Sequence, residues 1–393
     1  MTDHLSYAKS LVSEMKKQNP GFSGLSHMVL DAGAVLQVSR YVKENGLGPS
    51  IIVVDANTYE ACGKILEEQF AAEGIEARLC LLKPDKQGDV VADEQSIMQL
   101  FIEAEPARTG SLIAAGSGTI HDITRFVSHR TGKPFISVPT APSVDGFTSL
   151  GAPVIVRGVK QTFPAAAPVA IFADLDILAS APQPLVAAGF GDMLGKYTSL
   201  FDWKFSALAG DEPYDDQVAM ITERALEACV KHVEAIGERS EEGIRILMTA
   251  LIESGIAMLL FGQSHPASGA EHHLSHYWEM EYLRLGRRAL LHGAKVGVAC
   301  GEISQLYHDA VDKGIYPGAE PKEWNTLRNR ARKWLDHVPA KEEIARLLKQ
   351  AGGPSSIGEL GLDQALLESS LQEAHTLRNR HTLLRILNEA GAR

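Results

Sequence analysis

Leu112-Ile-Ala-Ala-Gly-Ser-Gly-Thr-Ile-His-Asp122 is the stretch that decides the fold of the first part of this chain. It opens with an apolar run typical of a buried strand, continues through two glycines, and enters a helical pattern near Thr119. Glycines let the backbone approach a phosphate group closely, and the free N–H groups of a first helical turn can bind that group. Because many strand–helix turns carry glycines for packing alone, this turn by itself indicates a nucleotide site only weakly.

The sequence around this stretch repeats the same alternation of short apolar runs and longer periodic segments. The expected strands lie at residues 51–54, 77–82, 112–115 and 135–138, and the expected helices at residues 58–73, at 94–105 and from about 119. This βαβα rhythm predicts a parallel sheet with helices on both faces. The β-type runs at residues 153–163 and 169–172 look different, because two short runs around Gly158 can pair as a hairpin.

Strand signals stop at about residue 183, and helical periodicity dominates the rest of the chain. The expected helices lie at residues 186–209, 217–238, 242–261, in the histidine-bearing stretch near 268–276, and at 290–307, 322–337, 341–350 and 363–389. The sequence therefore predicts an α/β half, residues 1–180, followed by an all-helical half, residues 181–393.

Composition limits the class of protein. Hydrophobic residues make up 45% of the chain, and the formal net charge of −11 argues against nucleic-acid binding, which needs clustered basic side chains. The four cysteines lie far apart without a C-x-x-C pair, which favours reduced core thiols and a cytoplasmic setting. No apolar run approaches the roughly 18 residues of a membrane span, and residues 1–20 fit an amphipathic helix better than a signal peptide, so membrane insertion is not expected.

Asp55 strengthens the nucleotide interpretation, because it follows the strand at residues 51–54 and so lies at the carboxyl edge of the expected sheet. An acid there can bind the adenosine ribose of a dinucleotide; the alternative is an Asx turn with Asn57. In the usual fingerprint the acid comes about 20 residues after the glycines, whereas Asp55 precedes them. The two features fit together only if they belong to adjacent strands of a differently arranged sheet.

A third polar segment, Pro139-Thr-Ala-Pro-Ser-Val-Asp-Gly-Phe-Thr-Ser149, directly follows the strand at residues 135–138. Its prolines, glycine and hydroxyl side chains predict a rigid loop that can line a ligand. Taken alone, however, an ordinary capped turn explains the same composition.

Metal-binding signals lie in the helical half. Ser268-Gly-Ala-Glu-His-His-Leu-Ser-His276 is followed by His292, and an isolated Asp192 lies upstream in Gly189-Phe-Gly-Asp-Met-Leu-Gly-Lys196. One carboxylate and two or three imidazoles are typical of a catalytic divalent metal with one coordination position left open. Spacing alone does not decide among His272, His276 and His292 as ligands.

The residues around these histidines predict supporting roles. His272 and His276 share one helix face, and His273 points about 100° away, so His273 is not expected to be a ligand. Ser268 and Glu271 form an S-x-x-E pattern that can cap the helix, and Glu271 is a cap or a partner of a ligand. Gly293, Gly297 and Gly301 predict a smooth helix face that lets another helix pack closely.

Together these motifs resemble the iron-containing alcohol dehydrogenase / glycerol dehydrogenase / dehydroquinate synthase superfamily. The segments at residues 139–149 and 268–276 are most similar to the Gram-positive bacterial glycerol-1-phosphate dehydrogenases. The resemblance covers nearly the whole chain, least clearly after about residue 305. It implies a dehydroquinate synthase-like fold: an α/β dinucleotide-binding domain at residues 1–180, an all-α metal- and substrate-binding domain at residues 181–393, and the active site in the cleft between them.

The resemblance also implies roles for individual residues. The metal ligands are Asp192, His272 and His292, the catalytic residues are Asp192 and His276, and the substrate contacts are Asp145, Asp192 and His276. Apart from the resemblance, the substrate phosphate needs donors in an acidic chain, and Lys196 and the backbone near residues 143–146 are the candidates. The cofactor residues are Asp55, Gly116, Gly118, Thr119, Ile120, His121, Asp122, Thr140, Ala141, Pro142, Ser143 and Ser149. Lys196 stands where iron-type alcohol dehydrogenases place an extra histidine ligand, which favours nickel or zinc over iron.

The expected reaction is reversible reduction of dihydroxyacetone phosphate to sn-glycerol 1-phosphate by NADH, or by NADPH. The metal is the expected Lewis acid, and His276, or a water held by it, is the expected proton donor. Asp55 predicts a preference for NADH, because its charge repels the 2′-phosphate of NADPH. A small phosphorylated substrate, a homodimer and a role in supplying phospholipid or teichoic-type precursors follow from the same resemblance. The alternatives are a glycerol or polyol dehydrogenase, a dehydroquinate synthase-like lyase and a non-catalytic binding protein.

Overall fold

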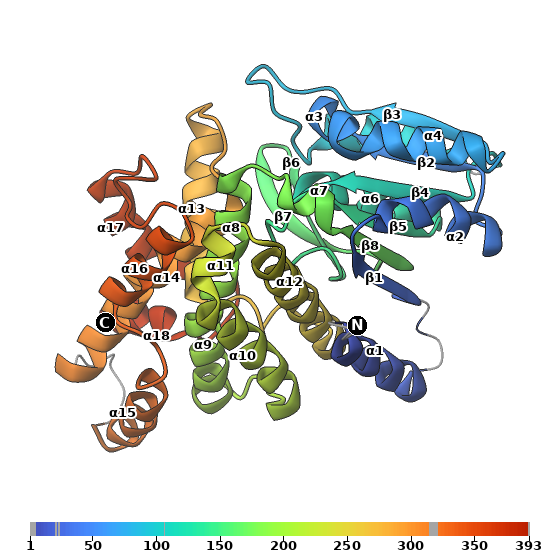
Figure 1. Cartoon of the computed structure of the whole chain (residues 1–393). Coiled ribbons are helices and arrows are strands. Elements are labelled where there is room, and N and C mark those ends of the chain that lie inside the picture. The colour runs from blue at the N-terminus through green and yellow to red at the C-terminus, as the bar shows by residue number, and fades with distance from the viewer. Residues whose placement is uncertain (1–4, 20–21, 23, 106, 314–320, 392–393) are drawn as a thin grey trace. The chain divides into compact units, whose positions relative to one another are not determined.

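The structure, a computed structural model, describes residues 5–19, 22, 24–105, 107–313 and 321–391. The chain divides into two compact units. The first consists of Met1–Val186 together with Arg239–Leu260, and the second of Ala187–Glu238 together with Phe261–Arg393. The helix α12 (Glu241–Phe261) therefore belongs almost entirely to the first unit, although it lies far along the chain (Figure 1).

A six-stranded sheet forms the centre of the first unit. Its strands are, in spatial order, β1 (His27–Asp31), β8 (Ala170–Asp174), β5 (Phe135–Pro139), β4 (Ser111–Gly116), β2 (Ser50–Val54) and β3 (Ala77–Leu81). Every neighbouring pair is parallel, so the predicted parallel sheet is confirmed.

Helices cover both faces of this sheet, as predicted. The alternating side chains of β2 show this: Ile52 and Val54 lie in one core cluster with residues of α2 (Val38–Glu44) and α4 (Lys64–Ala72). Ile51 and Val53 lie in the opposite cluster with residues of α5 (Glu94–Glu103) and α6 (Gly118–Thr131). A strand buried on both faces must be apolar at successive positions, which is why residues 51–54 form an unbroken apolar run. Shorter elements α3 (Ala56–Thr58), a π-helical turn (Tyr59–Gly63) and α7 (Leu175–Ala179) complete the layers.

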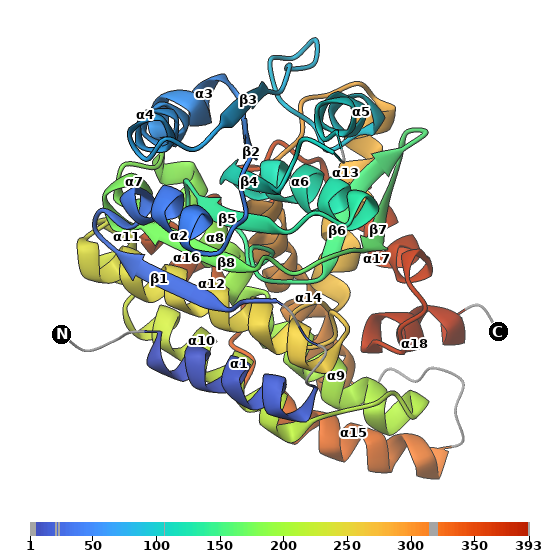
Figure 2. The same cartoon turned by 90° about the vertical axis from the view of Figure 1, so that its right-hand side faces the viewer.

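The predicted hairpin is confirmed for residues 153–163 and wrong for residues 169–172. Strands β6 (Gly151–Val156) and β7 (Val159–Pro164) pair antiparallel, and Figure 2 shows them beside α6. Arg157 and Gly158 both have positive φ, the geometry of a tight turn that matches strand twist. Residues 170–174 instead form β8, a fully buried strand of the parallel sheet between β1 and β5. Neither β8's place in that sheet nor the edge strand β1 was anticipated.

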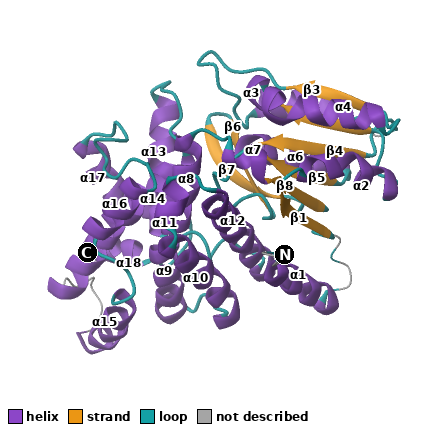
Figure 3. Cartoon of the chain, viewed as in Figure 1, coloured by secondary structure: helices purple, strands orange, loops and turns teal. Residues whose placement is uncertain are grey.

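The second unit is helical throughout the residues that the structure describes, which confirms the predicted helical part (Figure 3). Three predicted helices are each interrupted: Gly195 separates α8 from α9, His232 separates α10 from α11, and a 3-10 turn followed by an extended segment separates α17 from α18. The helices are α8 (Gln183–Leu194), α9 (Lys196–Gly210), α10 (Asp216–Lys231), α11 (Val233–Gly237), α13 (Ala270–Arg284), α14 (His292–Lys313), α15 (Pro321–Leu335), α16 (Lys341–Gln350), α17 (Gln364–Glu373) and α18 (Leu383–Gly391), with the 3-10 turn η3 (Ala374–Leu377).

Helix α12 corrects the expectation that no segment is apolar enough to resemble a membrane span. Within the described residues it is the one helix that is long and apolar enough to cross a membrane, judged by length and composition alone. Its mean hydropathy is 1.9 over its best window. Arg245 and Glu253 interrupt the apolar run, which is why the sequence shows no continuous stretch. Because 67% of that window is buried, α12 has the character of a core helix.

Two smaller predictions are confirmed. Helix α1 (Ser6–Gln18) is amphipathic: Ala8, Val12 and Met15 are buried along one side, while lysines occupy its last turn. All four cysteines are free and buried, as expected of reduced core thiols.

Candidate metal centre and nucleotide-binding edge

Asp192 of α8, His272 of α13 and His292 of α14 come together in the second unit. One ligand atom from each lies within 4.8 Å of the others, and His272 Nε2 is 3.8 Å from Asp192 Oδ1. The rings of His272 and His292 have centroids 5.2 Å apart. A carboxylate and two imidazoles that converge in this way form a donor set suited to a divalent transition metal.

Glycines allow the helices that carry Asp192 and His292 to approach each other. A Cβ atom at Gly293 would collide with the carbonyl of Ala188, and one at Gly191 would collide with the carbonyl of Gly293. A Cβ added at Gly297 would lie only 3.0 Å from the Cα of Gly191, so the smooth face predicted on α14 is confirmed at these positions. At Gly301, by contrast, an added Cβ would meet Lys341 at an ordinary 3.5 Å.

Glu271 orients the candidate ligand His272. His272 Nδ1 donates to Glu271 Oε1 at 2.7 Å, which leaves Nε2 as the lone-pair nitrogen that faces Asp192. Glu271 also accepts from the Thr198 hydroxyl at 2.7 Å and from the backbone N–H of Gly269 at 2.6 Å. Burial by itself raises the pKa of this carboxyl, but the hydrogen bonds outweigh burial and hold the pKa at about 2. Glu271 was expected to be a cap or a partner of a ligand. It contacts both the N-cap residue Gly269 and the candidate ligand His272.

The predicted capping of α13 by Ser268 is wrong. The N-cap residue is Gly269, and Asp202 Oδ2 accepts from the backbone N–H of Ala270 at 2.8 Å. The same carboxylate accepts from Tyr307 Oη at 2.8 Å and from the backbone N–H of Leu383 at 3.1 Å. Asp202 thus holds the start of the histidine-bearing helix, and its burial, with the nearby charge of Glu271, raises its pKa to about 7. No local pattern in the sequence marks this role.

Lys196 follows Asp192 by four residues, a spacing that is also typical of an exposed ion pair on a helix. The structure instead places Lys196 inside the second unit. Its side chain is 0% exposed, and Nζ donates to Asp192 Oδ1 at 3.1 Å and to the Ala267 carbonyl at 3.2 Å. An ammonium with this burial already has a carboxylate and a carbonyl as acceptors. The predicted phosphate contact of Lys196 stays a prediction.

His276 borders the candidate metal centre without joining its ligand group. Its ring centroid lies 6.5 Å from that of His272 and 6.2 Å from that of His292. Arg378 Nη2 contacts its Nδ1 at 3.5 Å. His273 lies outside the group, as its direction on the helix predicts; it is 1% exposed, and burial lowers its pKa to about 3.

The nucleotide signals gather at one edge of the sheet in the first unit. Strands β5, β4 and β2 are successive neighbours, and Asp55, Gly116 and Thr140 stand at or just after their carboxyl ends. The backbone N–H of Thr140 donates to the Gly116 carbonyl at 3.0 Å. Because β2 pairs directly with β4, Asp55 and the glycine turn do belong to adjacent strands. The reversed order of acid and glycines therefore follows from the strand order.

The hydrogen bonds of Asp55 form a capping box rather than an Asx turn with Asn57. Asp55 Oδ1 accepts from the backbone N–H of Thr58 at 2.8 Å, and Thr58 Oγ1 accepts from the backbone N–H of Asp55 at 2.9 Å. Within the described part of the chain its second carboxylate oxygen makes no hydrogen bond. Asp55 is partly exposed, so that oxygen is available to a ligand.

Helix α6 begins with no side-chain cap, so N–H groups of its first turn are open to an anion. A Cβ at Gly116 would collide with Ile120, which gives this glycine a packing role as well. His121 is 1% exposed, and its Nδ1 donates to the Ser117 carbonyl at 2.9 Å while Nε2 accepts from Ser137 Oγ at 2.7 Å. Any contact between His121 and a cofactor would thus involve its backbone.

The loop at residues 139–149 is rigid because a buried arginine holds it. Arg125 donates to the carbonyls of Gly146, Phe147 and Gly151. Ser254 of α12 donates to Asp145 Oδ2 at 2.9 Å, so α12 supports the same loop. The predicted cofactor residues Thr140, Ala141, Pro142, Ser143 and Ser149 are all buried in it. The substrate role of Asp145, which belongs to the first unit, stays a prediction.

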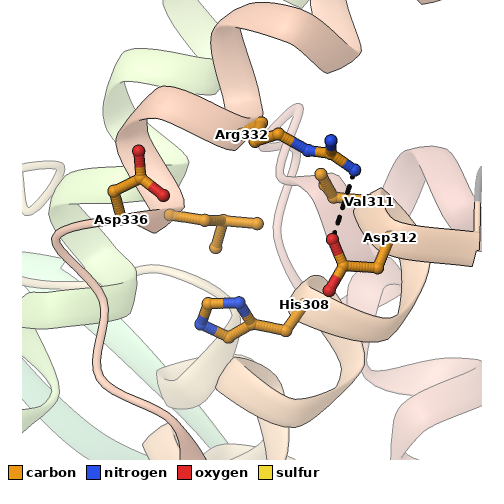
Figure 4. Close-up of a pocket in the computed structure, with 6 residues that line it drawn as sticks. His308, Val311, Asp312, Arg332 and Asp336 are labelled. Carbon is orange, nitrogen blue, oxygen red and sulfur yellow. Dashed lines mark hydrogen bonds and ion pairs between the residues drawn. The ribbon is translucent and has the colours of Figure 1, made fainter.

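A surface pocket of about 270 Å³ between α14 and α15 contains none of the predicted site residues (Figure 4). Its lining includes an exposed ion pair, Arg332 with Asp312 at 3.2 Å, and His308, whose Nε2 contacts the Val338 carbonyl at 3.0 Å. Solvated pairs of this kind carry no distinctive chemistry.

Comparison with known proteins defines the class. Residues 29–182 match the family model described as iron-containing alcohol dehydrogenase. The fold is similar to a probable glycerol dehydrogenase from Sinorhizobium meliloti 1021, with a TM-score of 0.68, 16% identity and coverage of 94% of this chain and 96% of that chain. It is also similar to glycerol dehydrogenase from Schizosaccharomyces pombe, with a TM-score of 0.67, 18% identity and coverage of 94% and 89%. The chain has the fold of the iron-containing alcohol dehydrogenase class.

Sequence relatives narrow this class to one family. The chain is 48% identical over 379 residues to glycerol-1-phosphate dehydrogenase (NAD(P)+) from Geobacillus stearothermophilus, covering 93% of each chain. Identity to the protein of the same name is 45% in Bacillus subtilis (strain 168), over 93% of this chain and 91% of that protein, and 30% in Methanosarcina barkeri, over 86% and 83%. The chain belongs to the glycerol-1-phosphate dehydrogenase family and is an oxidoreductase.

Proposed function

We propose that this protein interconverts dihydroxyacetone phosphate and sn-glycerol 1-phosphate by hydride transfer with NADH, assisted by one divalent metal. The observation that carries the proposal is the convergence of Asp192, His272 and His292 within 4.8 Å in a chain of this family. NADPH is the alternative hydride donor.

Asp192, His272 and His292 would hold the metal. The fit rests on the donor set itself and on Glu271, which fixes His272 with Nε2 toward Asp192. When bound, the cation supplies Lewis acidity that polarises the substrate ketone. Because Lys196 stands where iron-type alcohol dehydrogenases place an extra histidine ligand, the protein would supply three ligand side chains. The lysine also places a positive charge 3.1 Å from Asp192 Oδ1. This donor set supports nickel or zinc over iron.

His276 is the proposed proton donor to the oxygen that becomes the product hydroxyl. Its Nδ1 faces the Arg378 guanidinium at 3.5 Å, so Nδ1 is the acceptor and the proton sits on Nε2. Nε2–H is then the group that hydrogen-bonds the substrate oxygen or a water that protonates this oxygen, and Arg378 keeps the ring in this tautomer.

The dinucleotide is proposed to bind at the carboxyl edge of β2, β4 and β5. The uncapped start of α6 suits the pyrophosphate, and Asp55 suits the adenosine ribose. The charge of Asp55 supports a preference for NADH over NADPH. The Arg125-supported loop would line the site with the hydroxyls of Thr140, Ser143 and Ser149.

We further propose a cytoplasmic homodimer that supplies glycerol 1-phosphate for phospholipid or teichoic-type precursors. The four free, buried thiols support a reducing compartment. The dimer follows only from the family resemblance, and sedimentation of the purified protein tests it.

The reaction is tested with metal-stripped protein reconstituted separately with nickel, zinc or iron. Oxidation of NADH is measured with dihydroxyacetone phosphate, and the product is resolved on a chiral column. Metal-dependent turnover that yields the sn-1 isomer is expected. Turnover of glycerol with no reaction of the phosphorylated ketone would contradict the proposal and indicate a polyol dehydrogenase.

A further inference from the structure

Two arginines from one short extended segment hold the start of the histidine-bearing stretch. Arg378 and Arg380 lie between the 3-10 turn η3 and α18. Arg378 Nη1 donates to Ser268 Oγ at 2.9 Å, and Arg380 Nη1 donates to the Ser268 carbonyl at 3.0 Å. Ser268 is therefore the anchor of this segment, and both guanidinium groups lie within the second unit close to the candidate metal centre.

Arg380 has the contacts of a structural residue. Its side chain is 6% exposed, and Nε donates to Glu212 Oε2 at 2.7 Å. Glu212 also contacts His265 Nε2 at 3.2 Å. Burial raises the pKa of the Glu212 carboxyl, but its basic neighbours outweigh burial and lower the pKa to about 2. A buried charge that is paired with a carboxylate in this way already has its counter-charge and needs no anionic ligand.

Arg378 differs because its acceptors are neutral. Its partners are Ser268 Oγ and His276 Nδ1, and no carboxylate lies within ion-pair distance among the residues that the structure describes. Burial lowers its pKa to about 10, and the charge of Arg380 contributes, yet the side chain stays cationic at neutral pH. A partly exposed guanidinium in dense surroundings, next to a second arginine and without a counter-charge, is a strong site for an anion.

The position of Arg378 relates this anion site to the metal centre. His276 lies between them: its ring is 6.2 Å from the ring of His292, and its Nδ1 is 3.5 Å from Arg378 Nη2. In dihydroxyacetone phosphate, one methylene and one ester oxygen separate the ketone carbon from the phosphorus. A molecule with its ketone at the metal group and its hydroxyl proton supplied by His276 would thus bring its phosphate toward Arg378.

We propose that Arg378 binds the phosphate group of the substrate and gives the site its preference for a phosphorylated ketone. The inference rests on the proposed function and identifies the residue that recognises the charged end of its substrate. The planar fork of an arginine matches two phosphate oxygens, and Ser268 Oγ, which accepts from the same guanidinium, holds the fork in place. Lys196, which is fully buried against Asp192, does not take this role.

The test compares wild type with Arg378→Met, using dihydroxyacetone phosphate and unphosphorylated dihydroxyacetone as alternative substrates. Loss of the charged fork is expected to raise KM for the phosphorylated ketone about 100-fold. The ratio of kcat/KM for that ketone to kcat/KM for dihydroxyacetone should fall by a similar factor, because a disturbed His276 affects both substrates alike. Inorganic phosphate should inhibit wild type competitively and should lose that inhibition in the variant. Arg346→Met removes a matched arginine, exposed and paired with Glu343, and should change none of these values.

Binding measurements separate this inference from the proposed function. Calorimetric titration with inorganic phosphate should show binding to wild type and to Arg346→Met. Binding should be weaker in Arg378→Lys and absent in Arg378→Met. If the methionine variant fails to fold, Arg378→Lys still provides the test. Unchanged KM and phosphate binding in Arg378→Met, with wild type active on dihydroxyacetone phosphate, would overturn the role of Arg378 alone. Wild type without activity on that ketone would overturn the proposed function itself.

Discussion

The two units of this chain build their candidate sites from different kinds of groups. In the first unit the candidate site lies along one edge of the sheet, where three neighbouring strands end and α6 begins without a side-chain cap. In the second unit the site is a point, where side chains from three helices converge within 4.8 Å. A site made largely of backbone groups should keep its binding when a single side chain changes. A site made of a few converging side chains should not. The difference predicts where substitutions will have large effects.

Removal of a ligand from the second unit should have the largest effect. His292→Ala deletes one of the three candidate ligand side chains, so metal binding should weaken and kcat/KM should fall by about 1,000-fold or more. The metal content after dialysis and the rate of NADH oxidation check this together. His308→Ala, on the same helix but facing the Val338 carbonyl, is the control and should leave both unchanged.

The close approach of α8 and α14 can be disturbed without substituting a candidate ligand, although a methyl group added at Gly293 also meets Asp192 Cβ at 3.1 Å. Gly293→Ala places a methyl group against the Ala188 carbonyl, which should destabilise the protein by about 1–3 kcal/mol or more and lower its metal content. Gly301→Ala adds the same methyl group to the same helix, where the nearest atom lies at 3.5 Å, and should be tolerated. Thermal unfolding of the two variants measures the contrast. Equal melting temperatures would show that helix packing does not set the site.

The orientation of His272 sharpens the comparison further. Glu271→Gln removes the negative acceptor of His272 Nδ1–H while it keeps the side-chain shape, so metal affinity should fall by about 10- to 100-fold. Competition with a chelator of known affinity measures the change. Glu302→Gln, which alters a carboxylate paired with Lys341 instead, should bind the metal as wild type does.

A substitution at the edge in the first unit should have the smallest effect. Asp55→Asn removes a charge but keeps an acceptor for the Thr58 N–H, because asparagine also caps helices well. We expect the preference for NADH over NADPH to fall by about tenfold, with kcat for NADH and the melting temperature nearly unchanged. The ratio of kcat/KM for the two cofactors is the measurement. An unaltered ratio would mean that Asp55 does not face the adenosine ribose.

Local sequence patterns predicted the first unit better than the second for a physical reason. Asp55 and the glycine turn fit one site only if they belong to adjacent strands, and the pairing of β2 with β4 shows that they do. The strand at residues 170–174 was misplaced because an isolated run of buried residues beside a hairpin carries no signal of the sheet it joins.

In the second unit, sequence predicted residue types but not their contacts. The histidines and Asp192 stood out by chemistry, yet spacing did not rank them, and only the resemblance selected Asp192, His272 and His292. The contacts of Asp202 with Tyr307 and of Arg378 with His276 join residues more than 100 positions apart, and no local pattern marks either. Ser268 was expected to cap α13 because its motif fits, but the carboxylate of Asp202 takes that position.

The most direct test of the account is metal binding by wild type and by Asp192→Asn, measured by equilibrium dialysis against nickel and zinc. Asparagine keeps the size of the side chain and removes the anionic ligand, and Lys196 then lacks the charge with which it pairs. The account predicts one ion per chain in wild type, with metal-dependent NADH oxidation, and loss of both in Asp192→Asn. An Asp192→Asn protein that binds one ion with unchanged affinity and remains active would contradict it.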